Sequence, residues 1–222
     1  MRKIGTNVML ILAVAMVVFV AASARAATIT YFTTTPVPST LTDWTGSLPF
    51  LQFDPSLGTL TSVELVLNSS MNTTITITNL ATSSSTGSVG TELFLTVTYG
   101  SLINEQMYEE FPDPRVSFSL NPGQTKILGP YTANGAIDAT YTDSAVLAAF
   151  TGTGFITLDA STATFTVLSY TGGVMEASQV TLADLNGYVI YNYDPVPEPS
   201  VLLLFGSGLI GLGAFARRKF KK

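Results

Sequence analysis

The sequence predicts an all-β protein whose central domain is an antiparallel β-sandwich of the immunoglobulin-like or jelly-roll type. Apolar and polar residues alternate with period two through much of residues 27–193, as in strands that bury one face. Turn-forming residues punctuate this pattern at Asp54-Pro55, Asn121-Pro122-Gly123, Asn134-Gly135, Gly152-Thr153-Gly154, Gly172-Gly173 and Asn186-Gly187. Strands of about six to nine residues separated by such turns are typical of a sandwich.

The individual strands are predicted from runs in which every second residue is apolar. Residues 74–78 alternate threonine with isoleucine. The apolar sides of the other runs consist of Val63, Leu65, Leu67, Leu93, Leu95, Val97, Tyr99, Val116, Phe118, Leu120, Phe165 and Val167. Threonine fills many of the intervening positions, where its β-branched side chain suits a pleated backbone. We therefore expect the apolar set to face the core and the threonines to face solvent.

One segment, residues 143–150, has the composition of a short helix. It is rich in alanine, valine and leucine, and Asp143 or Ser144 can accept a hydrogen bond from a free backbone N–H of the first turn. We expect a helix of one or two turns there, in a connection between the two sheets.

The N-terminal segment, residues 1–26, has the three parts of a signal peptide. Arg2 and Lys3 precede an apolar run at 8–20, and the small residues Ala24 and Ala26 mark a cleavage site. Cleavage after Ala24 is an alternative to cleavage after Ala26. A second alternative is an uncleaved N-terminal membrane helix, for which the apolar run is short.

The charge distribution separates the two ends of the chain from its centre. Between Ala27 and Ser200 the sequence holds 15 acidic residues and only two basic ones, Arg115 and Lys126, for a formal net charge of −13. Such a body is repelled by nucleic acid and by anionic lipid surfaces. We therefore expect no nucleic acid partner.

The chain contains no cysteine and no histidine. The first absence excludes disulfides and thiol chemistry. The second excludes an imidazole general base, a nucleophile activated by histidine, and a zinc site with histidine ligands.

The C-terminal segment, residues 194–222, also has three parts. They are the tripeptide Pro197-Glu198-Pro199, an apolar run at 201–216, and a basic cluster that begins with Arg217, Arg218 and Lys219. Positive charge on the far side of a terminal apolar helix predicts a transmembrane anchor with its tail in the cytoplasm. As a helix the run is about 24 Å long, which is marginal against a hydrocarbon core of roughly 30 Å. A temporary anchor therefore fits better than a permanent one, although a plain uncleaved tail anchor remains the alternative.

The order of tripeptide, glycine-punctuated apolar run and basic cluster closely resembles the PEP-CTERM sorting signal of Gram-negative bacteria. The resemblance implies processing by an exosortase, a membrane-embedded enzyme, at a motif formed by Pro197, Glu198 and Pro199. It also implies an exported protein, held transiently in the inner membrane, whose host produces exopolysaccharide and forms biofilms.

The central domain is similar to the choice-of-anchor E domain, an extracellular module attached to different sorting signals in different bacteria. The similarity lies in residues 48–63 and again in 149–154. It carries no activity or binding residues to transfer. The same residues can also be interpreted simply as part of the hydrophobic core, with Phe50 and Phe53 buried at the start of a strand.

Without histidine or cysteine, catalysis would depend chiefly on carboxylates. Glu105, Glu109, Glu110 and Asp113 form the densest group, in a predicted loop. A glycosidase needs two carboxylates that face each other across a cleft at roughly 5–10 Å. Charged loop residues are more often simply solvated, so we expect that the protein is not an enzyme.

Calcium is the one cofactor that the residues suggest. Carboxylate oxygens are its preferred ligands, and extracellular modules often bind it weakly. Asp138, Asp143 and Asp159 are the candidate ligands, with the 105–113 segment as an alternative.

Aromatic side chains that are exposed on a β-surface can stack on sugar rings. Trp44, Tyr108 and Phe111 are the candidates for such contacts. A single tryptophan near the first strands of a domain is more often buried in the core, and that is the competing interpretation of Trp44.

These observations predict an exported cell-surface or extracellular-matrix protein with a structural or adhesive role in an exopolysaccharide matrix. A carbohydrate-binding, lectin-like module is the alternative. The expected partners are signal peptidase and exosortase during export, the inner membrane in transit, and exopolysaccharide at the destination.

Overall fold

The computed structural model describes residues 26–196 together with 206, 208 and 210. Strands in antiparallel sheets account for 75% of the structure, which confirms the predicted all-β class. The elements in chain order are β1 (Ala27–Phe32), β2 (Val37–Leu41), β3 (Thr45–Leu51), β4 (Gly58–Asn79), β5 (Ser85–Tyr99), β6 (Ile103–Leu120), β7 (Thr125–Tyr141), α2 (Ser144–Phe150), β8 (Phe155–Thr171) and β9 (Met175–Pro195).

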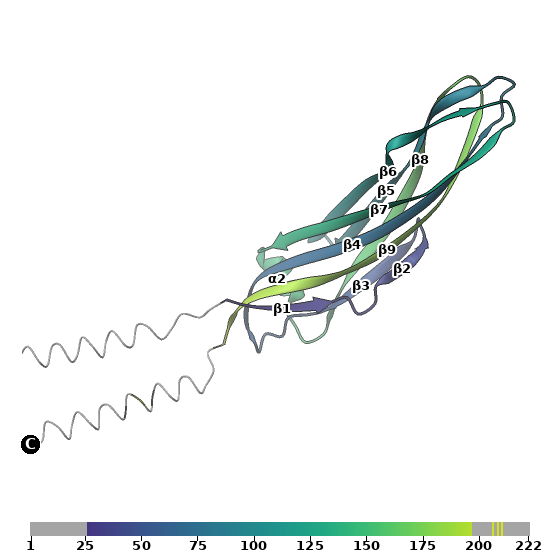
Figure 1. The fold of residues 1–222 in the computed structure, drawn as a ribbon. Helices are drawn as coiled ribbons and strands as arrows, with labels where there is room; N and C mark the ends of the chain where they lie inside the picture. Colours follow the sequence, from purple (N-terminus) through teal and green to yellow (C-terminus); the bar gives the residue numbers. More distant parts are fainter. Residues whose placement is uncertain (1–25, 197–205, 207, 209, 211–222) are drawn as a thin grey trace, which may run out of the picture. The chain divides into compact units, whose positions relative to one another are not determined.

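The strands form two sheets. Sheet A has the order β1-β9-β4-β7, with β2 also paired to β9, and sheet B has the order β3-β8-β5-β6. Figure 1 shows the two layers, with β4, β7 and β9 in front of the fainter β5 and β8. This arrangement is consistent with the predicted sandwich, because each sheet can bury one face against the other.

The chain divides into two compact units. One contains residues 28–55 and 60–192, which is most of the sandwich, and the other includes residues 56–59 and 193–196 among those described. Within the second unit, the Val196 N–H donates to the Leu57 carbonyl at 3.1 Å. A side chain at Gly58 would place its Cβ 2.1 Å from the Asp194 carbonyl oxygen, so this approach requires glycine. Ordered backbone pairing therefore reaches the residue before Pro197.

The predicted helix is present as α2 and connects β7 of sheet A to β8 of sheet B. Asp143 is its N-cap, and the Asp143 carboxylate accepts from the Ala145 N–H at 2.8 Å. Val146 and Phe150 are the buried residues of the helix. Both the cap and the crossover agree with the sequence prediction.

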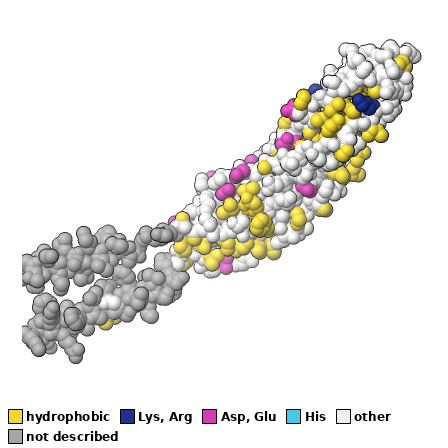
Figure 2. Space-filling model, viewed as in Figure 1, with side chains coloured by type: hydrophobic (Ala, Val, Ile, Leu, Met, Phe, Trp, Pro, Cys, Tyr) yellow, Lys and Arg dark blue, Asp and Glu magenta, His cyan; other side chains and the backbone are white. Residues whose placement is uncertain are grey.

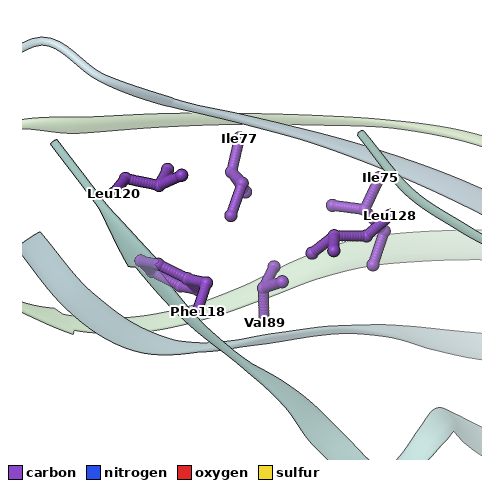
Figure 3. Packing of buried hydrophobic residues seen from close by; sticks show 6 residues of the cluster. All are labelled: Ile75, Ile77, Val89, Phe118, Leu120 and Leu128. Carbon is purple, nitrogen blue, oxygen red and sulfur yellow. The ribbon is translucent and has the colours of Figure 1, made fainter. Parts of the chain in front are cut away.

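The core follows the alternation that the sequence predicts for β4 and β5. Val63, Leu65 and Leu67 are at most 1% exposed, and Leu93 and Leu95 are fully buried. Towards the end of β4, a second group of buried side chains packs between β4, β5, β6 and β7. Figure 3 shows this cluster, which contains Ile75, Ile77, Val89, Phe118, Leu120 and Leu128.

Strand β8 departs from the predicted pattern. Phe165 is 56% exposed, whereas Thr162 is 7% exposed. The Thr162 hydroxyl accepts the Asp43 N–H at 3.0 Å, so its burial leaves no polar group unpaired. The prediction that Phe165 faces the core is therefore wrong, and the outer face of sheet B gains an aromatic side chain.

A buried polar cluster links the two sheets in the middle of the sandwich. The Thr73 hydroxyl of β4 shares hydrogen bonds with the Thr91 hydroxyl of β5 at 3.1 Å and the Thr181 hydroxyl of β9 at 2.8 Å. The Thr91 hydroxyl also donates to the side-chain amide oxygen (Oε1) of Gln179 at 2.7 Å. The strand registers shift at the same level, between Thr73 and Ile75 in one pair and between Val89 and Thr91 in another.

Replacing Thr73 with valine is expected to lower the free energy of unfolding by about 1–3 kcal/mol, because buried hydroxyls lose their partner while the side-chain shape is kept. Urea denaturation measures the change. Thr76→Val, at a half-buried position of the same strand, is the matched control and should have little effect. Equal stability of the two variants would show that the buried cluster contributes nothing.

The predicted signal peptide at 1–26 and transmembrane helix at 201–216 lie almost wholly outside the described residues. Among the residues that are described, no helix has the length and apolar character needed to cross a membrane.

Candidate functional site

Side chains that point away from the core gather on the outer face of sheet B. In β5, successive side chains alternate between the core and this outer face. Leu93, Leu95 and Val97 point inward, so Phe94 and Thr96 point outward. Directly opposite residues of antiparallel strands share a face. The strand register therefore brings residues from β3, β6 and β8 onto the same surface as Phe94.

Three aromatic side chains meet on this surface and form what we call the aromatic platform: Phe94, Tyr108 and Phe165. Tyr108 lies directly opposite Phe94, and their ring centroids are 4.9 Å apart. The Phe165 ring centroid is 6.0 Å from that of Phe94. The three side chains are 39%, 49% and 56% exposed respectively, so the platform presents ring surface to solvent.

A polar hollow of about 470 Å³ adjoins the platform on sheet B. It is lined by Thr45, Gly46, Thr96, Thr98, Asp159, Ala160 and Ser161. Thr96 and Thr98 follow Phe94 along the outward side of β5, and the register places Ser161 and Asp159 opposite them on β8. Hydroxyl groups and one carboxylate therefore continue the surface that the platform begins.

A charged group borders the platform on its other side. The Arg115 Nε donates to the Glu110 carboxylate, and the Arg115 guanidinium lies 3.5 Å from the Glu92 carboxylate. The Arg115 side chain passes over Gly90, where a Cβ would come within 3.1 Å of the Arg115 Cγ. This arginine is therefore already paired with two carboxylates.

These charges shift the acid–base behaviour of the neighbouring groups. The hydrogen bond from Arg115 lowers the pKa of Glu110, and the same pair raises the pKa of Arg115. Partial burial, together with Glu92, raises the pKa of Tyr108. The Tyr108 hydroxyl, 3.5 Å from the Glu110 carboxylate, therefore stays neutral at ordinary pH and can donate or accept hydrogen bonds.

Of the three predicted ligand-binding aromatics, the structure places only Tyr108 on this surface. Phe111 is 2% exposed and belongs to the core, because it differs from Tyr108 by an odd number of positions in β6. Trp44 lies immediately before β3, at an even-numbered position like Leu48 and Phe50, which are fully buried. Within the described residues, its buried indole N–H has no hydrogen-bond acceptor. The competing core interpretation of Trp44 fits this position better.

The carboxylates that were candidates for catalysis lie in strand β6 and not in a loop. Glu109 and Glu110 are consecutive, so their side chains project from opposite faces of the sheet. Glu105 accepts a hydrogen bond from the Tyr141 hydroxyl at 2.7 Å. Glu110 is paired with Arg115. Two of the four carboxylates are therefore already engaged with partners.

The three candidate calcium ligands lie on different elements. Asp138 is on β7 of sheet A, Asp143 caps α2, and Asp159 is on β8 of sheet B. Across residues 26–196, no three Asp, Glu, His or Cys side chains come close enough to hold a metal ion. The structure does not bring these aspartates together.

Sequence reasoning missed Phe94 and Phe165, although a signal for Phe94 is present. In β5 it interrupts the polar side of a strand whose apolar side is complete without it. An aromatic residue at such a position is either a surface contact or a sign of a second buried face. Phe165 gives no comparable signal, because the apolar side of its strand, which would be expected to face the core, faces solvent at this position.

The predicted processing residues Pro197, Glu198 and Pro199 and the membrane-stop residues Arg217, Arg218 and Lys219 lie outside the described residues, as does Ala24. A comparison with protein families nevertheless covers the C-terminal segment. The model of the PEP-CTERM protein-sorting motif matches residues 195–219. The chain carries a PEP-CTERM sorting motif. This motif implies an exported protein that an exosortase sorts through its C-terminal segment at the membrane.

Other comparisons add little about the body of this PEP-CTERM protein. No curated protein matches the chain at a significant level. A structure of the Gx strain of infectious bursal disease virus is similar at a TM-score of 0.18, with 10% identity over 82% of this chain and 43% of the viral chain. T=1 particles derived from the same virus give a TM-score of 0.13 and 12% identity, over 81% of this chain and 42% of theirs.

The chain thus spans less than half the length of these viral proteins. TM-scores this low support no conclusion about fold or function. The resemblance of residues 48–63 and 149–154 to the choice-of-anchor E domain is not confirmed and stays a hypothesis.

Proposed function

We propose that the exported body of this PEP-CTERM protein is an adhesion module of the extracellular matrix, which binds polysaccharide through the outer face of sheet B. The observation that carries this proposal is the aromatic platform beside a hydroxyl-lined hollow on one exposed sheet. This proposal combines a structural or adhesive role in the matrix with lectin-like binding, because a matrix protein can adhere by binding sugar chains.

The chemistry of the two parts suits a sugar chain. The flat apolar face of a pyranose ring packs on an exposed aromatic ring. Phe94, Tyr108 and Phe165 provide three such rings. The hydroxyls at the rim of the sugar need donors and acceptors, which the threonines and Asp159 of the hollow supply. A ligand site of this kind combines aromatic surface with a few placed polar groups.

The size of the surface favours several linked sugars over one. Phe94 and Thr98 are four positions apart on β5, which corresponds to about 13 Å along the strand. A chain that follows β5 would contact the aromatic platform and the hollow at once. Many weak contacts along a polymer add up when they are linked, so a shallow surface can hold a long ligand.

The sorting motif agrees with this role but does not identify the ligand. The proposed route has a signal peptide, 1–26, removed by signal peptidase, and a C-terminal segment processed by exosortase at Pro197-Glu198-Pro199. The destination is the cell surface or the matrix, where polysaccharide is available. A calcium ion is not required by the proposed binding.

Binding without catalysis is the proposed mode of action. Near the platform, Glu92 and Glu110 are both in contact with Arg115, and the hydrogen bond from Arg115 lowers the pKa of Glu110, which favours its ionised form. A general acid for glycoside cleavage must instead be protonated near neutral pH. We therefore propose that the protein is not an enzyme.

The test is polysaccharide binding by a variant that lacks two rings of the platform. Phe94→Ala combined with Tyr108→Ala is expected to weaken binding about 10- to 100-fold, since each factor of ten corresponds to about 1.4 kcal/mol. Affinity electrophoresis in gels that contain matrix polysaccharide measures this change. Phe32→Ala is the matched control. Phe32 is 68% exposed and packs on Tyr188, and both residues belong to sheet A, away from the platform. Equal binding by the wild type and both variants would contradict the proposal.

A further inference from the structure

The outer face of sheet B has a charge pattern that selects among polysaccharides. We infer that its ligand is an uncharged sugar chain, and that the face rejects chains bearing carboxylate or sulfate groups. This inference rests on the proposed function and concerns the chemistry of the ligand at the same surface.

The face lacks an available cation. Arg115 is the basic residue beside the platform, and its guanidinium contacts both Glu92 and Glu110. Lys126, the other basic residue between 27 and 196, is on β7 of sheet A, where it pairs with Ile77. A carboxylate or sulfate group of a ligand would therefore have to displace an existing ion pair to find a positive partner.

The face also carries negative charge that a charged ligand would meet directly. Asp159 lines the hollow, and Glu92 and Glu110 together exceed the single charge of Arg115. These groups belong to a body with a formal net charge of −13 between 27 and 200. Figure 2, which is drawn from the side of sheet A, shows acidic side chains and few basic ones there too, so the surface around the proposed site is also acidic. Both local contact and the wider field therefore disfavour a polyanion.

The remaining polar groups match neutral sugar hydroxyls. Thr45, Thr96, Thr98 and Ser161 offer hydroxyls that both donate and accept. The Asp159 carboxylate accepts from a sugar hydroxyl in a charge-assisted hydrogen bond. The Tyr108 hydroxyl remains neutral, since its pKa is raised by partial burial and by Glu92. None of these contacts needs a charge on the ligand.

A panel of polysaccharides tests the inference on the full protein. The neutral probes are laminarin, xyloglucan and galactomannan, the anionic probes are alginate and hyaluronan, and the cationic probe is chitosan. We expect at least one neutral probe to bind with a Kd that changes less than about twofold between 0.05 and 0.5 M salt. The anionic probes should bind at least tenfold more weakly at low salt.

Two substitutions sharpen the test. Asp159→Asn keeps a hydrogen-bonding side chain and removes the charge, so it should improve alginate binding severalfold. Neutral binding should weaken, because the charge-assisted hydrogen bond is lost, so the ratio of alginate to neutral binding rises. Asp138→Asn removes the same charge from β7 of sheet A and should leave both unchanged. An equal effect of the two variants would mean that total charge, and not the face of sheet B, sets the selectivity.

The outcomes separate this inference from the function on which it rests. Preferential binding to alginate or hyaluronan overturns the inference but leaves the proposed function standing if Phe94→Ala with Tyr108→Ala abolishes that binding. Tighter, salt-sensitive binding to chitosan likewise overturns it in favour of an amine-bearing chain. No binding of the wild type to any probe would count against the proposed function itself.

Discussion

Replacing Tyr191 with alanine is expected to lower the free energy of unfolding by about 3–5 kcal/mol, the range for removal of a buried aromatic side chain. Tyr191 is fully buried on β9. Its ring centroid lies 5.8 Å from that of Tyr31, 5.9 Å from that of Phe53 and 6.1 Å from that of Phe150. The substitution would thus leave a cavity at the centre of an aromatic cluster that Tyr31 of β1, Phe53 and Phe150 of α2 complete.

The conservative variant separates packing from hydrogen bonding at the same position. The Tyr191 hydroxyl donates to the Leu51 carbonyl at 2.8 Å, and Tyr191→Phe removes only that bond. Its expected cost is about 1 kcal/mol. Thermal and urea denaturation of both variants measure the difference. A loss below about 1 kcal/mol for Tyr191→Ala would show that the cluster is not a main part of the core.

Replacing the tripeptide Pro197-Glu198-Pro199 with three alanines is expected to abolish C-terminal processing. Proline favours extended backbone in the residue before it and cannot continue a helix, so these two prolines favour an extended tripeptide. Extended, unpaired backbone is what a processing enzyme needs, and ordered backbone pairing reaches Val196, immediately before the tripeptide. Mass spectrometry of membrane and matrix fractions should then find only protein that retains residues 201–222.

A control within the apolar run keeps this second prediction specific. Ser207→Ala changes a small side chain without altering the tripeptide or the basic cluster, so processing should continue at the wild-type rate. Unchanged processing of the triple-alanine variant would show that the sorting enzyme does not depend on the tripeptide.

Much of the fold follows from local patterns in the sequence. The alternation in β4 and β5, the Asp143 cap and the crossover between sheets all appear as predicted. These features depend on nearest neighbours, and that is why they can be read without tertiary contacts. The C-terminal sorting motif is likewise a local pattern, and the family comparison confirms it.

The face of β8 could not be predicted from hydropathy. Its register with β5 places Phe165 opposite Glu92, which turns the phenylalanine outward. The inward Thr162 is tolerated because its hydroxyl accepts from the backbone of Asp43, which lies far away in the sequence. Such long-range pairing decides which residues of β8 face the core when the alternation of apolar and polar residues is weak. The sequence of the strand alone does not indicate it.

The candidate site was only partly predictable for a related reason. The sequence indicates Tyr108, but it predicts a loop at residues 105–113, and in a loop alternate residues need not face opposite sides. As part of β6, that segment must send Tyr108 and Phe111 to opposite faces. The strand geometry excludes Phe111 from the exposed face and places Phe94 of β5 beside Tyr108.

Hydroxyl-radical footprinting with and without a neutral oligosaccharide tests most directly whether the outer face of sheet B binds sugar. Exposed aromatic rings react with the radical and lose that reactivity when a ligand covers them. The predicted result is protection of Phe94, Tyr108 and Phe165, with Phe32 and Tyr188 on sheet A reacting as before. Protection confined to Phe32 and Tyr188 would contradict the account.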